Sequence, residues 1–152
     1  MLSRNLNFFS GLAAGLSVLL VGACGPQPEA YVGTYSGKLE RTETRGQQTF
    51  KQDYEPYLVH VAPAETGDLY MQLRDECAVA AQMQDDGAFE IVGQPCKENL
   101  ESFGLDAVVN GSGSVSEDGK LTVEFTLTGT TRRNAMDTQE YSSTESFTGE
   151  IQ

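Results

Sequence analysis

Three cysteine thiols, one imidazole and a surplus of carboxylates are the side chains of this sequence that could do chemistry. The thiol with the most distinctive surroundings is Cys24, which directly follows the small residues Gly22 and Ala23 at the end of an apolar stretch over residues 8–21. A single early cation, Arg4, precedes that stretch. An early cation, a short apolar segment and small residues before a processing point describe a removable secretory signal. The pattern therefore indicates that the chain is cut next to a nucleophilic thiol.

The residues Val21, Gly22, Ala23 and Cys24 resemble the lipobox of bacterial lipoproteins. The resemblance implies that a diacylglycerol is attached to the Cys24 sulfur, that the preceding peptide is removed, and that the new amine receives a further chain such as palmitate. Because Gly25 follows the cysteine where an aspartate would signal inner-membrane retention, it also implies sorting to the outer membrane. Two or more buried acyl chains hold a protein firmly on a bilayer. We therefore expect lipidation at Cys24 and a location in the bacterial cell envelope.

The apolar stretch itself is too short to remain as a membrane helix. It holds about 14 residues and is interrupted by serines and glycines, whereas a spanning helix needs roughly 20 apolar residues. The alternative is a plain secretory signal, cut near Ala23 or between Glu29 and Ala30, in which Cys24 is incidental.

Composition divides the chain into a signal over residues 1–23, a lipidated tether over residues 24–30 and one domain over residues 31–152. The full chain has a net charge of −12, and loss of Arg4 with the signal makes the mature chain more acidic still. Such a surface repels nucleic acid and anionic headgroups. It leaves a basic protein as a possible partner.

Runs rich in Thr, Val, Tyr and Phe, separated by turn residues, predict an all-β domain. The clearest run has Leu121, Val123, Phe125 and Leu127 alternating with polar residues, which is typical of a half-buried strand. The best helical candidate, over residues 97–103, is a turn or two at most. The predicted strands cover roughly residues 31–41, 48–62, 68–75, 77–84, 88–96, 105–116, 120–131 and 138–152.

Two strand pairings can be predicted in detail. Residues 116–120 suit a three-residue hairpin loop with Gly119 in the left-handed region. The first and last strands carry small and apolar residues on one face, and pairing them would remove both sheet edges. We therefore expect an antiparallel up-and-down meander that closes into a roughly eight-stranded barrel. In the hairpin around residues 116–120, the expected register pairs Val115 with Leu121, Gly113 with Val123, Gly111 with Phe125 and Val109 with Leu127.

The other two cysteines, Cys77 and Cys96, lie on strands joined by a predicted two-residue turn at Asp86 and Gly87. Residues equally distant from that turn face each other, which places the two cysteines within reach of a disulfide. A bulge near Pro95 is expected to adjust their geometry. An exported chain in an oxidising compartment should form this bond, and the alternative is a pair of free thiols.

Three features of the domain resemble the lipocalin-like lipoproteins of bacteria. These are the opening residues Gly33, Tyr35 and Gly37, the mid-chain cysteine pair, and the strand with Gly111 and Gly113 that leads into a tight hairpin. The resemblance implies a lipocalin-like barrel over most of the domain, although the chain has no tryptophan, which lipocalins proper carry in an early Gly-x-Trp.

No pattern points to catalysis or to a metal. His60 is the only histidine, which is too few for a zinc site, and no serine elbow accompanies it. Two acidic groups, Asp85, Asp86 and Glu90 or Asp75 and Glu76, do not follow a calcium-loop spacing. Turn formation explains Asp85 and Asp86 without a metal. We therefore predict a protein that is not an enzyme and has no cofactor.

Two functions remain open. The first is a lipid-anchored barrel that holds a small apolar ligand or helps to maintain the envelope. Eight strands give a barrel of the size at which side chains either fill the interior or leave room for one small ligand. The second is an acidic module that captures a basic envelope or host protein, as an inhibitor would. The residues predicted to line the ligand site are Tyr35, Leu39, Leu58, Leu69, Met71, Val123 and Phe125.

Overall fold

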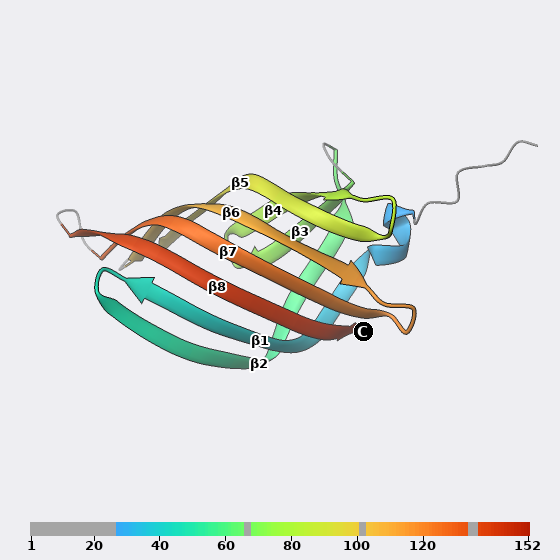
Figure 1. The fold of residues 1–152 in the computed structure, drawn as a ribbon, viewed down its shortest axis with the longest axis horizontal. Coiled ribbons are helices and arrows are strands. Elements are labelled where there is room, and N and C mark those ends of the chain that lie inside the picture. The colour runs from blue at the N-terminus through green and yellow to red at the C-terminus, as the bar shows by residue number, and fades with distance from the viewer. Residues whose placement is uncertain (1–26, 66–67, 101–102, 134–136) are drawn as a thin grey trace, which may run out of the picture.

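The protein folds as one closed barrel of eight antiparallel strands in chain order, with β1 hydrogen-bonded to both β2 and β8 (Figure 1). This computed structural model describes residues 27–65, 68–100, 103–133 and 137–152. The predicted all-β class and up-and-down topology are confirmed. The signal segment and Cys24 lie outside the described residues. Among those residues, no helix has the length and hydropathy that crossing a bilayer requires.

The strands agree closely with those predicted from the sequence. A short 3-10 helix, η1 (Pro28–Tyr31), precedes β1 (Gly33–Arg45), β2 (Gln48–Pro63), β3 (Leu69–Arg74), β4 (Cys77–Met83), β5 (Ala88–Leu100), β6 (Phe103–Val115), β7 (Lys120–Arg132) and β8 (Thr138–Ile151).

The helical candidate over residues 97–103 was wrong, because residues 97–100 extend β5 and Phe103 begins β6. Cys96 and Glu98 are buried while Lys97 is exposed, so the side chains alternate between the two faces of a strand.

The β6–β7 hairpin has the predicted register, from Val115 opposite Leu121 to Val109 opposite Leu127. Its loop closes through a 2.9 Å bond from the Ser116 amide to the Lys120 carbonyl, and Gly119 has a φ of +82°. A residue with a Cβ is rarely found at such a φ, which explains the glycine. The local sequence therefore specifies this hairpin.

Closure of the barrel depends on two glycines. β1 and β8 pair with Tyr35 opposite Ile151, Gly37 opposite Gly149 and Leu39 opposite Phe147. A Cβ on Gly37 would lie 2.7 Å from the carbonyl carbon of Thr148, which is closer than real Cβ atoms approach. The strands can therefore meet here only because neither glycine carries a side chain.

The predicted disulfide between Cys77 and Cys96 is present, with the two Cα atoms 4.9 Å apart. The register of its hairpin differs by one residue from the prediction, because Met83 pairs with Phe89 across a three-residue loop in which Gly87 has a φ of +86°. A bulge follows on β5, where the pairing with β6 shifts between Ile91 and Gln94. This extra residue restores the alignment of the two cysteines.

The two ends of the barrel differ. We call the end that carries η1 the closed end, since the Tyr31 hydroxyl donates to the Gly87 carbonyl at 2.8 Å and the Tyr35 hydroxyl donates to the Tyr31 carbonyl at 3.0 Å. The opposite end, where the β1–β2 hairpin extends at the left of Figure 1, is the open end. There β3 stops at Arg74 and β4 starts at Cys77, so the wall is lower on that side than along its longer neighbours.

Candidate binding site at the open end of the barrel

Inward-facing side chains change from apolar to charged along the barrel. On β1, Tyr35 and Leu39 are buried in the closed half, and the same face continues toward the open end with Arg41, Glu43 and Arg45. Strand β8 shows the same change. We call the polar residues inside the open half the inner polar cluster. Its members are Arg41, Glu43, Arg45, Arg74, Glu98, Tyr141, Ser143 and Glu145.

Glu145 lies at the centre of this cluster and is 0% exposed. Its Oε1 accepts hydrogen bonds from the Arg74 guanidinium and from the Ser143 hydroxyl, the latter at 3.0 Å. Its Oε2 lies 3.1 Å from Nε of Arg41. One buried carboxylate therefore holds two guanidinium groups that come from β1 and β3.

Arg74 connects the centre of the cluster to its outer members. Its Nη1 lies 3.6 Å from Oε2 of Glu98, and its Nη2 donates to the Tyr141 hydroxyl at 2.8 Å. The Tyr141 hydroxyl in turn donates to Oε2 of Glu43 at 3.3 Å, while Oε1 of Glu43 lies 2.9 Å from Nη2 of Arg45. A continuous set of polar contacts thus runs from Arg74 on β3 to Arg45 at the rim of the open end.

The cluster contains three arginines and three glutamates, so its formal charges balance. This matters because a buried ion is tolerated only when opposite charge and hydrogen bonds compensate its lost hydration. Burial acts to lower the pKa of Arg74, but the charge of Glu145 and the contact with Tyr141 raise it above its usual value. Burial also raises the pKa of Tyr141, and it raises the pKa of nearby Tyr57 to about 12. Arg74 therefore stays charged, and both phenols stay protonated, at neutral pH.

Glu98 should make the stability of the barrel depend on pH. Burial raises the pKa of its carboxyl, although Arg74 and Arg41 act to lower it. The folded state therefore binds the Glu98 proton more tightly than the unfolded chain does. This stabilises the fold fully below the unfolded pKa of about 4.3, and the stabilisation is lost as the pH rises through the folded pKa. The variant Glu98→Gln lacks this titration, so it should gain stability relative to the wild type as the pH rises above the unfolded pKa and through the raised folded pKa. Urea unfolding across that range measures the difference, and a difference that falls or stays constant would contradict the stated direction.

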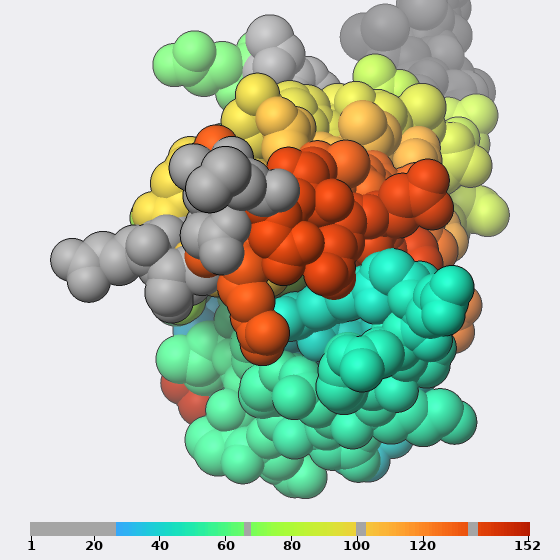
Figure 2. Space-filling view, turned by 90° about the vertical axis from the view of Figure 1, so that its left-hand side faces the viewer, coloured from blue at the N-terminus to red at the C-terminus, as the bar shows by residue number. Residues whose placement is uncertain are grey.

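Above the inner polar cluster, the rim encloses a small pocket of about 110 Å³, which we call the rim pocket. Its cation Arg45 is held by two contacts, since Cζ of the guanidinium lies 5.0 Å from the centre of the Phe103 ring and Nη2 lies 2.9 Å from Oε1 of Glu43. The Arg45 side chain is still 32% exposed, so it can meet a ligand. Figure 2 looks onto this end, with the β1–β2 hairpin beside β7 and β8. The pocket is lined by Arg45, Gln48, Phe50, Phe103, Thr131, Arg133, Asp137 and Gln139.

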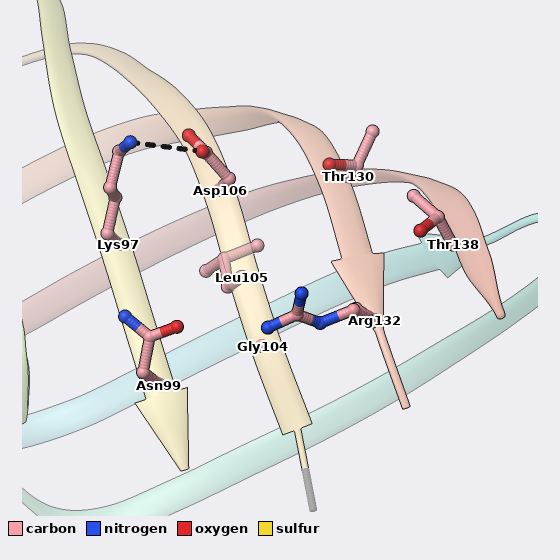
Figure 3. A pocket seen from close by; sticks show the side chains of 8 residues that line it. All are labelled: Lys97, Asn99, Gly104, Leu105, Asp106, Thr130, Arg132 and Thr138. Carbon is pink, nitrogen blue, oxygen red and sulfur yellow. Dashed lines mark ion pairs between the residues drawn. The ribbon is translucent and has the colours of Figure 1, made fainter. Parts of the chain in front are cut away.

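A second hollow of about 320 Å³ lies on the outer wall of β5 to β8 near the open end (Figure 3). Nζ of Lys97 lies 3.1 Å from Oδ2 of Asp106, and both side chains are well exposed. A Cβ on Gly104 would lie 3.8 Å from Nε of Arg132, so the glycine leaves space beneath that side chain. None of the described residues that line this hollow is aromatic, and it offers hydrogen bonds from an open surface.

The residues predicted to line an apolar ligand site lie mainly in the packed core. Six of the seven are 0–2% exposed and belong to the hydrophobic cluster of the barrel: Tyr35, Leu39, Leu69, Met71, Val123 and Phe125. The placement of Leu58 was wrong, because this side chain is 47% exposed on the outer wall. Its neighbour Val59 takes the inward position, and a strand turns successive side chains to opposite faces.

The other residues that could do chemistry, His60 and the acidic turn residues, make ordinary structural contacts. His60 is exposed, with Nδ1 2.8 Å from the Thr34 hydroxyl. Asp86 accepts a hydrogen bond from the Ala88 amide at 3.0 Å, as expected of a turn residue. Within the part of the chain that the structure describes, no three His, Cys, Asp or Glu residues are placed to hold a metal ion.

Sequence reasoning missed the inner polar cluster, although part of its signal was present. Arg41 and Glu43 follow Leu39 at intervals of two on β1, and Glu145 precedes Phe147 by two on β8. Both patterns place charges on the inner face of a strand. The pairing of these charges with Arg74 could not be read from the sequence, because β3 lies far from β8 along the chain.

Protein-family models, curated proteins and solved structures offer no match to this chain. The geometry by itself defines the class: a small closed antiparallel β-barrel with an apolar closed half and a charged, accessible open half.

Proposed function

We propose that this protein is a non-enzymatic lipoprotein of a bacterial cell envelope, anchored to the outer membrane through Cys24, whose barrel binds a small ligand at its open end. The observation that carries the proposal is the position of Gln27, the first residue that the structure describes. Gln27 and η1 lie at the closed end of the barrel, opposite the rim pocket (Figure 1).

The segment between Cys24 and Gln27 is short enough to fix which end of the barrel would lie near the membrane. The three residues from Cys24 to Gln27 span at most about 11 Å even when fully extended. A lipid on Cys24 would therefore keep the closed end next to the bilayer. The open end would point away from the membrane, where a ligand can reach it.

The rim pocket favours a ligand with both polar and apolar parts. Phe50 and Phe103 offer apolar surface, while Arg45 offers a guanidinium already held by Glu43. At about 110 Å³ the pocket is smaller than the roughly 300 Å³ of a usual small-molecule site, so it would take one group of a larger ligand. A wholly apolar ligand is less favoured, because side chains already occupy the apolar half of the interior.

Capture of a basic protein is the less favoured alternative. The acidic turns at Asp85 and Asp86 and at Glu117 and Asp118 belong to the closed end. On a lipid-anchored chain that end would face the bilayer, which leaves little room for a protein partner.

One preparation tests both parts of the proposal. The full chain is expressed with radiolabelled palmitate, extracted from the membrane fraction in mild detergent and analysed by native mass spectrometry. We expect label in the wild type and none in Cys24→Ser, and we expect a bound small molecule that is lost in Arg45→Gln. The matched control Arg132→Gln changes an arginine on the outer wall and should keep the ligand. An unlabelled chain in the soluble fraction would contradict the anchor, and ligand retained by Arg45→Gln would contradict the site.

A further inference from the structure

The longest strand of the barrel is paired on both sides over only a short part of its length. Residues 60–63 of β2 pair with β3, whereas residues 48–59 form strand pairs only with β1. The last contact with β3 is a hydrogen bond from the Tyr57 hydroxyl to the Leu73 carbonyl. Because β3 has only six residues, it is too short to run beside residues 48–54. In Figure 1 this part of β2 forms the outer strand of the hairpin at the lower left.

This edge is long, regular and exposed. Residues 48–54 keep an unbroken register with β1, contain neither glycine nor proline, and are exposed except for the half-buried Tyr54. Phe50 is 41% exposed. Unpaired strand edges carry a row of free backbone donors and acceptors, and natural proteins usually cover or interrupt them. Here the regular pairing with β1 is interrupted only after Tyr54, at Glu55 and Pro56, so seven consecutive residues could pair with an added strand.

We infer that an extended segment of another polypeptide adds to residues 48–54 as a further strand, completing the low side of the barrel wall. The inference rests on the proposed function in one respect, since it needs the open end to face away from the membrane. Strand addition of this kind takes its affinity from main-chain hydrogen bonds and its specificity from alternate side chains.

The side chains along the edge indicate what the added segment must carry. The Phe50 side chain lies on the inward face of β2, because Phe50 pairs with Glu43 on β1 and Glu43 is buried inside the barrel. An apolar residue is therefore expected next to it. On the outer face, Asp53 already contacts Nζ of Lys38 at 3.0 Å, whereas Lys51 forms no ion pair with any described residue. An acidic residue opposite Lys51 would supply its missing partner.

Two other occupants are less compatible with the geometry. The chain before Gln27 begins at the closed end and is too short, once processed at Cys24, to reach the open end. A second copy would pair its own β2 antiparallel across a two-fold axis, which reverses the direction of the second barrel. The two lipid anchors would then point in opposite directions and could not share one membrane.

The test uses the full chain in detergent micelles and a display library of random nine-residue peptides as the probe. We expect the selected peptides to alternate apolar and polar residues and to place Asp or Glu opposite Lys51. Binding of the best synthetic peptide should slow amide hydrogen exchange of residues 48–54 at least tenfold. The variant Lys51→Glu should weaken that peptide at least tenfold, and a peptide with Lys in place of its acid should restore binding. The matched control Lys120→Glu changes an exposed lysine on β7 and should have no effect.

Three results would overturn the inference. The first is a library that yields no binding peptide, and the second is a peptide that protects only the amides around the rim pocket; either leaves the anchored, ligand-binding barrel intact. The third is a dimer in sedimentation analysis with residues 48–54 protected in the absence of peptide, which would assign the edge to a second copy. Loss of the anchor or of the ligand, with peptide protection retained, would instead contradict the proposed function alone.

Discussion

Replacing Glu145 by glutamine should lower the free energy of unfolding by about 3–5 kcal/mol, the usual effect of removing one partner from a buried ion pair. The carboxylate is fully buried and contacts the guanidinium groups of both Arg74 and Arg41. Glutamine preserves the size of the side chain but removes its charge, which leaves two cations without their shared partner. Urea unfolding monitored by circular dichroism measures the change.

The matched control is Glu40→Gln. Glu40 also accepts a contact from a cation, Lys38, but its side chain is 61% exposed. Exposed ion pairs contribute about 0–1 kcal/mol, so this variant should stay near the wild type. A loss below about 1 kcal/mol for Glu145→Gln would show that the inner polar cluster is solvated or rearranges easily.

Replacing Gly37 by alanine should destabilise the barrel by about 3 kcal/mol, at the upper end of the usual effect of overpacking. The added Cβ would meet the backbone of Thr148 and Gly149 on β8, and backbone in a closed barrel cannot move aside as a flexible side chain can. The strain falls at the contact between the first and last strands, so the variant should fold with an opened seam. Faster amide exchange confined to β1 and β8 would report that opening.

Gly104→Ala is the control for this substitution, since it adds the same methyl group to a strand of the same barrel. Its Cβ would lie no closer than 3.8 Å to Arg132, which is an ordinary contact. Stability should be unchanged or slightly raised, because alanine restricts the unfolded chain more than glycine does. Equal effects of the two substitutions would show that backbone contact at Gly37 does not control closure.

Together these variants separate two requirements of the fold. The Glu145→Gln variant tests whether charged groups inside the open half contribute to the stability of the fold. Gly37 tests whether the barrel closes by close backbone approach. If both predictions hold, the open end is a preorganised polar surface on a closed scaffold, as ligand binding at the rim pocket requires.

Features governed by neighbouring residues could be predicted from the sequence. The β6–β7 hairpin is an example, since Gly119 specifies the loop and the alternation from Leu121 to Leu127 specifies the buried face. The disulfide was also predicted, but the register near its turn was not. The loop at Gly87 is one residue longer than predicted, and the bulge expected near Pro95 lies between Ile91 and Gln94 and offsets that residue, so the two cysteines still align.

Where both faces of a strand are apolar, the pattern did not select the buried one. Leu58 and Val59 are adjacent and apolar, and only the position of β2 in the barrel places Val59 inside. The inner polar cluster is a stronger case. Charges on the inner face of β1 look unfavourable in the sequence, and they become compatible with burial only when distant strands supply opposite charges.

By itself, the sequence determined the all-β class, the meander, the closing pair of end strands and the disulfide, because turn residues and alternating side chains act over a few positions. Only the tertiary structure decided which end is open, how Arg41, Arg74 and Glu145 meet, and that residues 48–54 of β2 lack a second strand partner. Those features depend on unequal strand lengths and on contacts between residues far apart in the chain, and no local pattern encodes either.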